Sequence, residues 1–341
     1  MKQVVLRRGR LLVEDVPAPL VDEQNILVEV AYSLISTGTE ITGIKSSGQS
    51  LVRKAIQQPE NVKKILGILR ERGIKNTLAL VESKLEGASP LGYSCSGIVI
   101  QVGRGIERIK PGDRVACAGA GKANQAEIVL VPKNLVVKIP DGCSLPDAAS
   151  VTLGSIAIQG VRRASPSLGE NVAIIGLGLL GQLTVQLLKI AGCRTIGFDL
   201  QKSRVELAKE LGLDHGFVSS EVDVGKEVFS LTEGHGVDIT IITASAPSND
   251  TLVQQAMEIT RKKGKVVVVG DVGLGLNRSP FYEKELDLLI STSYGPGRYD
   301  ERYEEKGLDY PYAYVRWTEQ RNMEEYLKLI SEGKLNFNRL V

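Results

Sequence analysis

The sequence predicts an α/β protein with a β-rich N-terminal domain followed by a doubly wound parallel sheet. Three observations carry this prediction. Short strand patterns separated by turn residues fill most of residues 1–147. From about residue 148, strand and helix patterns alternate, as in sheets covered by helices on both faces. A glycine-rich stretch, 176–181, lies where a buried strand pattern passes into an apolar helix pattern.

The N-terminal strands are predicted from alternating apolar residues and flanking turns. A Lys-Pro-Gly-Asp turn signature, 110–113, precedes one of them. Together they are typical of a barrel-like domain, which we place at residues 1–147. The predicted strands are 3–7, 10–15, 25–33, 91–102, 114–118, 125–131 and 134–139.

An insertion at about 42–89 interrupts these strands with two amphipathic helix patterns, 50–72 and 75–84. It carries nine lysines and arginines against four glutamates. Two interpretations remain open: a positive surface that binds an anionic substrate, or a solvated helical hairpin.

The second domain is placed at 148–293, and 294–341 is expected to return to the first domain. A further helix pattern covers 321–331. The predicted strands are 172–175, 195–199, 239–243, 265–269 and 288–293, and the helices between them are 181–191, 202–211 and 251–259.

The stretch Gly176-Leu-Gly-Leu-Leu-Gly181 has the chemistry of a dinucleotide site. Gly176 permits a tight strand-to-helix turn, Gly178 lets a pyrophosphate approach the backbone, and Gly181 lets the helix pack close to the strand. The helix N-terminus then offers free N–H groups to the phosphates. Asp199, 18 residues past Gly181, is suited to accept hydrogen bonds from the adenosine ribose.

An acidic residue at position 199 favours NAD over NADP, because a carboxylate repels a 2′-phosphate. Lys202 and Arg204 follow closely and offset part of that repulsion. A tight turn without a ligand, with Asp199 as a turn cap, is the structural alternative.

Composition excludes several classes. The net charge of +2 gives no reason to expect nucleic acid or membrane partners, and no apolar run spans a bilayer. The N-terminus lacks an apolar signal core, so we expect a cytoplasmic protein. The four scattered cysteines favour buried thiols over disulfides or a zinc knuckle.

The order of the two domains, together with Gly112-Asp-Arg-Val115, resembles the medium-chain dehydrogenase/reductase superfamily, the zinc-type alcohol dehydrogenases and their relatives. The resemblance implies a GroES-like catalytic domain, a Rossmann NAD-binding domain and an oxidoreductase activity. Supporting segments are 26–30, 36–40, 90–94, 97–103, 126–127 and 137–141. Further cofactor contacts implied are Leu179, Leu180, Leu200, Thr243, Ala244, Gly270 and Val272.

More narrowly, the insertion and segments 281–287, 293–300 and 314–318 look like the first half of bacterial bi-domain oxidoreductases. That resemblance implies a sugar or nucleotide-sugar substrate and a second dehydrogenase domain, either following on the same polypeptide or separate. The chain stops where relatives add a strand and a helix, so we expect a fragment or cover from a neighbour. A homodimer is a further expectation from relatives.

This sequence departs from the superfamily pattern at the positions that bind zinc. Members that use zinc hold it with cysteine, histidine and acidic residues, but the matching positions here are Thr37, Tyr93 with Ser94, and Thr152. None is a good zinc ligand, and the four-cysteine structural lobe is absent. The sequence therefore predicts a metal-free site.

A site without zinc needs another group to handle the hydroxyl proton. Tyr93 is the first candidate, although an unperturbed tyrosine pKa of about 10 is high for a base at neutral pH. Lys122 is the candidate cation beside it, and Thr37 and Thr152 are candidates for orienting the substrate. Each candidate also has a purely structural interpretation. The Tyr93 phenol would then only fill space, Lys122 would be an exposed lysine, and the two threonines would bond nearby backbone.

Three functions remain open from sequence alone. The first is interconversion of a hydroxyl and a ketone on a polar, sugar-like substrate. The second is zinc-free reduction of an activated double bond, as in quinone and enoyl reductases. The third is a non-catalytic NAD-binding module that supports a partner dehydrogenase domain.

A tyrosine-rich region also stands out near the C-terminus. Seven of the ten tyrosines lie between Tyr282 and Tyr314, and Tyr294, Arg298 and Tyr299 surround a Gly-Pro-Gly turn. Aromatic rings beside arginine suit sugar stacking or anion capture, and core packing is the equal alternative.

Overall fold

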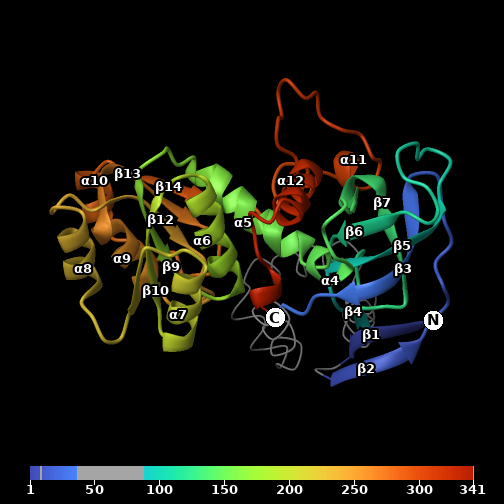
Figure 1. Ribbon diagram of the computed structural model, residues 1–341, viewed down its shortest axis with the longest axis horizontal. Coiled ribbons are helices and arrows are strands. Elements are labelled where there is room, and N and C mark those ends of the chain that lie inside the picture. The colour runs from blue at the N-terminus through green and yellow to red at the C-terminus, as the bar shows by residue number, and fades with distance from the viewer. Residues whose placement is uncertain (8–9, 37–87, 341) are drawn as a thin grey trace, which may run out of the picture. The chain divides into compact units, whose positions relative to one another are not determined.

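The computed structural model describes residues 1–7, 10–36 and 88–340 (Figure 1). The chain divides into two compact units, Met1–Val131 and Pro132–Val341, which we describe separately. The predicted helices within 42–89, and Thr37, lie outside the described residues. No helix among residues 1–7, 10–36 and 88–340 is long and apolar enough to cross a membrane.

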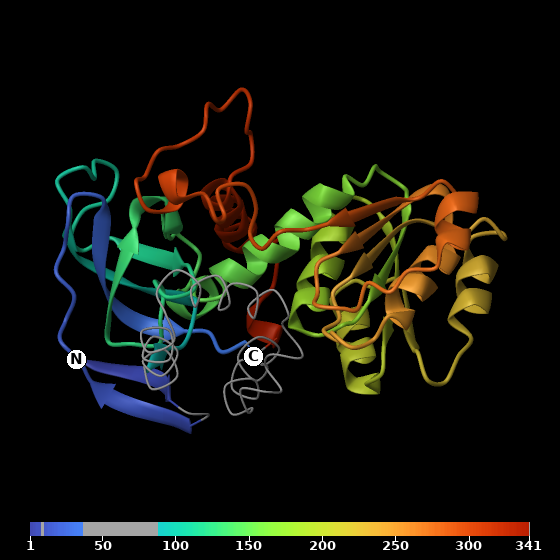
Figure 2. The same ribbon diagram turned by 180° about the vertical axis from the view of Figure 1, so that it is seen from behind.

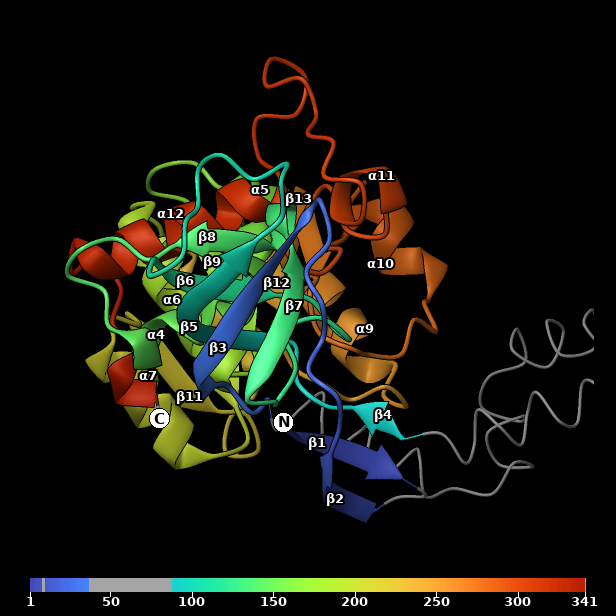
Figure 3. The same ribbon diagram turned by 90° about the vertical axis from the view of Figure 1, so that its right-hand side faces the viewer.

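The first unit contains two antiparallel sheets. In the smaller sheet, β1 (Lys2–Arg7) pairs with β2 (Arg10–Asp15) and with the short β4 (Ser89–Pro90). In the larger, curled sheet, β7 (Ile128–Pro132), β3 (Asn25–Ser33), β5 (Ser94–Val102) and β6 (Arg114–Ala118) lie side by side in that order (Figure 3). These strands surround a core of aliphatic side chains.

Close backbone contact between β3 and β5 explains one glycine in this sheet. A Cβ at Gly97 would lie 1.9 Å from the carbonyl oxygen of Glu29. Any other residue at Gly97 would therefore separate the two strands.

The second unit is built on a six-stranded parallel sheet in the order β11-β10-β9-β12-β13-β14. Figures 1 and 2 show it from opposite sides. The order reverses between β9 and β12, and ligands of such sheets bind outside the carboxyl ends of the strands at this point. The strands are β9 (Asn171–Ile175), β10 (Arg194–Asp199), β11 (His215–Val218), β12 (Val237–Ile242), β13 (Thr260–Val268) and β14 (Asp287–Ile290).

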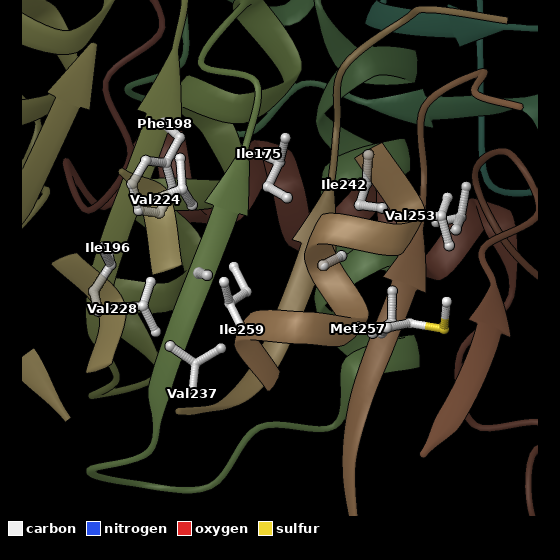
Figure 4. Packing of buried hydrophobic residues seen from close by; sticks show 14 of the residues in the cluster. Ile175, Ile196, Phe198, Val224, Val228, Val237, Ile242, Val253, Met257 and Ile259 are labelled. Carbon is white, nitrogen blue, oxygen red and sulfur yellow. The ribbon is translucent and has the colours of Figure 1, made fainter. Parts of the chain in front are cut away.

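Helices cover both faces of the parallel sheet. Helices α5 (Val151–Ala164), α6 (Leu179–Ile190) and α7 (Lys202–Glu210) share one apolar cluster with the strands. Helices α8 (Val224–Leu231) and α9 (Thr251–Ile259) pack on the other face, where Phe198, Val228 and Met257 belong to a second cluster (Figure 4). The predicted fold class is confirmed.

The C-terminal segment packs on the first elements of its own unit. The first elements of this unit are η1 (Lys133–Leu135), β8 (Val136–Lys138) and α4 (Leu145–Ala148). The helices toward the C-terminus are α10 (Arg278–Glu283), α11 (Glu301–Glu304), α12 (Glu319–Ser331) and η2 (Asn338–Leu340). The Gln320 side chain of α12 donates to the carbonyls of Lys133 and Val136. The buried Tyr326 of α12 lies so close to α5 that a Cβ at Gly154 would be 2.1 Å from its ring.

Several predicted boundaries differ from the structure for identifiable reasons. β13 begins at Thr260, earlier than expected, because α9 passes directly into it and Thr260 pairs its hydroxyl with that of Thr240 at 2.7 Å. The strand predicted at 134–139 is shorter, because residues 133–135 form a 3-10 turn first. The strand predicted at 288–293 ends at Ile290, where a loop begins.

Candidate cofactor site

Two positions in the turn between β9 and α6 can be occupied only by glycine. Gly176 has φ +96°, in the left-handed region, and a Cβ there would lie 2.7 Å from the amide nitrogen of Ala244. A Cβ at Gly181 would lie 2.0 Å from the carbonyl oxygen of Gly176. These contacts let β9, α6 and the end of β12 meet at the reversal of strand order.

Gly178 plays a different part, because a Cβ there would have no atom within 4 Å. It precedes the first residue of α6 and makes no side-chain cap. The amides of the first turn, Leu179 and Leu180 included, have no acceptor within the helix, and the helix dipole is positive here. Open space in front of such a helix N-terminus fits a pyrophosphate.

Asp199 closes β10 with its carboxylate held by the backbone. Oδ2 accepts the Leu177 N–H at 2.7 Å and Oδ1 accepts the Gln201 N–H at 2.9 Å. The residue is 8% exposed. Each carboxylate oxygen has a second lone pair, so Asp199 keeps the capacity to accept ribose hydroxyls.

Arg204 lies beside this carboxylate, with Nη1 3.7 Å from Oδ1 of Asp199. Its side chain is 47% exposed. The negative charge that would repel a 2′-phosphate is therefore partly offset, as the sequence suggested.

The remaining predicted cofactor residues follow the carboxyl ends of the neighbouring strands. Thr243 and Ala244 come after β12, and the Thr243 hydroxyl donates to the Gly176 carbonyl at 2.5 Å. Gly270 follows β13, and a Cβ there would lie 1.9 Å from the Ala244 carbonyl oxygen. Val272 pairs with Ala246 in an isolated parallel bridge.

After β10, Leu200 is 74% exposed and Lys202 begins α7. The parallel sheet therefore gathers all twelve predicted residues at one edge. Their contact with a cofactor stays a prediction.

Of the four catalytic candidates, the structure connects two. The Tyr93 carbonyl accepts the Gly119 N–H at 3.0 Å, and the Gly119 carbonyl accepts the Lys122 N–H at 3.1 Å. One glycine thus joins the backbones of Tyr93 and Lys122 within the first unit. Thr152 belongs to α5 in the second unit and is 1% exposed.

The donors present in the described residues do not fit a zinc site. No three histidine, cysteine or acidic side chains among residues 1–7, 10–36 and 88–340 are grouped to hold a metal. The chain's two histidines lie in β11 and in the turn after α8. Tyr93, Ser94 and Thr152 offer hydroxyls, which zinc binds poorly.

The cysteines are all buried, and two of them face each other. Cys95 of β5 is paired in register with Cys117 of β6. A hydrogen bond between the thiols, together with burial, raises the pKa of Cys117 well above its ordinary value. These two thiols therefore act as packing groups.

A polar cluster in the C-terminal segment adds Glu304 and Glu319 to Tyr294, Arg298 and Tyr299, which the sequence had singled out. Arg298 pairs with Glu304 at 2.6 Å and lies over the rings of Tyr294 and Tyr299 at 5.4 and 4.2 Å. Glu319, the first residue of α12, is fully buried beside them. Its two carboxyl oxygens, the Tyr294 hydroxyl and Nε of Arg298 have no hydrogen-bond partner within the described part of the chain.

Burial raises the pKa of Glu319 to about 9; Glu304 adds to the rise and Arg298 opposes it. Glu319 is therefore protonated at neutral pH. The crowding of tyrosines in the sequence marked this region, but nothing local marked Glu319.

Two family models match the chain. The alcohol dehydrogenase GroES-like domain matches residues 72–141, and the zinc-binding dehydrogenase model matches residues 180–307. The chain belongs to the medium-chain dehydrogenase/reductase superfamily. As a member of this superfamily, it is an NAD(P)-dependent oxidoreductase.

Relatives within the superfamily agree with this assignment. Sorbitol dehydrogenase of Bacillus subtilis is 29% identical over 251 residues, which cover 64% of this chain and 69% of that protein. Galactitol-1-phosphate dehydrogenase of Escherichia coli has a similar fold, with a TM-score of 0.74 at 21% identity over 98% of this chain and 90% of that one.

A zinc-binding dehydrogenase homologue of Sinorhizobium meliloti, solved with NADP bound, shares the fold as well. Its TM-score is 0.72 at 21% identity, covering 99% of this chain and 90% of that one. These structural likenesses show that the chain shares their fold.

Substituting Gly178→Asp tests the pyrophosphate position. The new carboxylate would occupy the open space before α6 and repel phosphate, so we expect NADH binding to weaken at least a hundredfold. Isothermal titration calorimetry measures this change. Gly225→Asp, in the first turn of α8, is the matched control and should bind NADH normally. Normal NADH affinity in Gly178→Asp would show that the phosphates lie elsewhere.

Substituting Glu319→Gln tests the buried acid. Because the pKa in the folded chain, about 9, exceeds the ordinary value, the free energy of unfolding contributed by Glu319 falls as pH rises from about 4.5 toward 9. The amide cannot ionise, so the free energy of unfolding of the variant, relative to that of the wild type, should rise by about 4 kcal/mol between pH 5 and pH 8.

Urea unfolding at both pH values measures the gain. Glu324→Gln, an exposed glutamate of the same helix, is the control and should show none. A pH-independent difference between wild type and Glu319→Gln would contradict the protonated state.

Proposed function

We propose that the chain interconverts a hydroxyl and a ketone on a polar, sugar-like substrate, using NAD(H) and no zinc. The observation that carries this proposal is the glycine turn before α6 with Asp199 held at the end of β10. Sorbitol dehydrogenase, a relative at 29% identity, is named for a polyol, which supports a polyhydroxylated substrate class.

The preference for NAD rests on charge. A ribose 2′-hydroxyl donates to the Asp199 carboxylate, whereas a 2′-phosphate meets its negative charge. Arg204, 3.7 Å away, reduces the penalty without removing it, because its side chain is half solvated. The NADP in the Sinorhizobium meliloti structure belongs to that protein and sets no preference for this one.

The absence of zinc rests on donor chemistry. The positions that align with the family's zinc ligands carry Thr37, Tyr93 and Thr152, and none supplies a thiolate, imidazole or carboxylate. A neutral hydroxyl holds zinc too weakly to fill such a site.

Within this proposal, the nicotinamide supplies the hydride chemistry and the chain's own residues handle the proton. Tyr93 exchanges the substrate hydroxyl proton through its phenolic oxygen, and Lys122, whose backbone is linked to that of Tyr93 through Gly119, is our candidate for a nearby cation. Thr37 and Thr152 orient the substrate oxygen by hydrogen bonds. The second dehydrogenase domain and the homodimer stay predictions.

The cofactor preference is tested by Asp199→Ala. Removing the carboxylate should narrow the ratio of NADH to NADPH affinity about tenfold, because both the ribose hydrogen bond and the repulsion disappear. Fluorescence titration of both cofactors measures the ratio. Asp214→Ala, a carboxylate remote from the glycine turn that pairs with Lys189, is the control. An unchanged ratio in Asp199→Ala would exclude its role.

The reaction is tested by screening polyols, sugars and their keto forms against quinones and enoyl substrates, with metal analysis of the same sample. We expect NAD-dependent turnover of a hydroxyl substrate without stoichiometric zinc. In Tyr93→Phe, kcat should fall at least a hundredfold with NADH affinity unchanged. Tyr32→Phe, an exposed tyrosine of β3, is the control.

Three outcomes would contradict the proposal. Turnover of alkenes alone would make the chain a double-bond reductase. NADH binding without any turnover would favour a supporting module. Full activity in Tyr93→Phe would leave its phenol a space-filling group.

A further inference from the structure

The chain's single tryptophan lies between two arginines. Cζ of Arg162 lies 3.2 Å from the centroid of the Trp317 ring, and Cζ of Arg316 lies 3.7 Å from it. Two guanidinium groups this close to one ring would overlap on the same face, so they lie on opposite faces. We call Arg162, Trp317 and Arg316 the Trp317 stack.

The stack joins two elements of the second unit. Arg162 comes from the last turn of α5, whereas Arg316 and Trp317 belong to the long loop between α11 and α12 (Figures 1 and 2). Nε of Arg162 donates to Oδ1 of Asn322 at 2.9 Å, and Nδ2 of this fully buried asparagine donates to the Tyr294 carbonyl at 2.9 Å. Arg162 is therefore held in place.

The positive charge of the stack is poorly compensated. Neither Arg162 nor Arg316 forms an ion pair with another residue of the described ranges, although Arg321 nearby pairs with Asp309. Burial and the neighbouring Arg316 lower the pKa of Arg162 to about 10, and Glu325 is the acid that opposes this. The two guanidinium groups on one indole therefore repel each other, and a bound anion would offset this repulsion.

The geometry also restricts the ligand. Stacking occupies the planar faces of the guanidinium groups. Nε of Arg162 already donates to Asn322, so the terminal amino groups of Arg162 and the edge of Arg316 are left to donate to an oxyanion. Both faces of the indole are covered, so the ring has no face for a base or a sugar. The paired positive charge suits a doubly charged group better than a single carboxylate.

We propose that the Trp317 stack binds a phosphate or diphosphate group through the N–H edges of Arg162 and Arg316. The group comes either from free phosphate or from a nucleotide-borne diphosphate. The site uses other residues than the glycine turn before α6, and its occupation requires neither cofactor nor turnover.

The tryptophan itself reports on this site, because its emission responds to what approaches the two arginines. The experiment titrates the full chain with inorganic phosphate, pyrophosphate and uridine diphosphate at constant ionic strength, using chloride as the reference anion. It is performed in the Gly178→Asp background, which blocks diphosphate binding at α6. We expect a saturable change in emission with at least one of the three probes.

Arg316→Gln is the decisive variant, because Arg316 is exposed and its loss should leave the fold intact. We expect affinity to fall about tenfold or more, since a charge-assisted pair of hydrogen bonds disappears. Arg316→Lys keeps the charge but loses the planar edge, so its affinity for the probe should lie between that of the wild type and that of Arg316→Gln. Arg302→Gln, an exposed arginine of α11, removes the same charge away from the indole and should bind normally.

Tighter binding of uridine diphosphate than of pyrophosphate would assign the site to a nucleotide-borne group, and equal binding would assign it to phosphate alone. No saturable change with any probe would overturn the proposal. Equal weakening in Arg302→Gln and Arg316→Gln would overturn it as well, because general charge attraction would then explain the binding. Neither result bears on whether the chain oxidises an alcohol.

Discussion

Close backbone contact at the reversal of strand order is the constraint on which this protein depends. Gly181 touches the Gly176 carbonyl, Gly176 touches Ala244, and Gly270 touches the Ala244 carbonyl. A methyl group at any of these three glycines would overlap a backbone atom. The turn, the start of α6 and the ends of β12 and β13 therefore share one arrangement, and that arrangement leaves open space only at Gly178.

Hydrogen bonds then adapt this edge of the sheet to a ligand. The Thr243 hydroxyl donates a hydrogen bond to the Gly176 carbonyl, and this bond connects the end of β12 to the turn. Asp199 is anchored by the amides of Leu177 and Gln201, so its carboxylate is oriented before any ribose arrives. Preorganisation of this kind lowers the entropic cost of binding. The positive charge of Arg204 partly offsets the negative charge of the Asp199 carboxylate.

The C-terminal segment holds α5 and the loop after β14 together in the second unit. Asn322 of α12 links Arg162 of α5 to the loop that leaves β14, and Tyr326 fills the space above Gly154. Arginines and tyrosines that would be costly to bury alone are arranged in stacks and ion pairs. The exception is Glu319, whose oxygens lack partners in the described ranges and which avoids the cost of a buried charge by staying protonated.

The sequence by itself determined the features whose physical causes are local. The glycine pattern at positions 176, 178 and 181, the acid at the end of the next strand and the alternation of strands and helices are all visible among neighbouring residues. For that reason the fold class was predicted and confirmed. The helix α5 was not predicted, because its sequence carries two glycines and five β-branched residues, which are weak helix formers.

Only the tertiary structure decided which distant side chains meet. Arg162 and Asn322 are 160 residues apart, and Glu319 is buried because α12 packs beneath the Gly-Pro-Gly turn. The Cys95 and Cys117 thiols meet through strand register. Burial and proximity of this kind depend on the whole packed chain, and they set the pKa of Glu319 and the environment of Trp317, which no local pattern encodes.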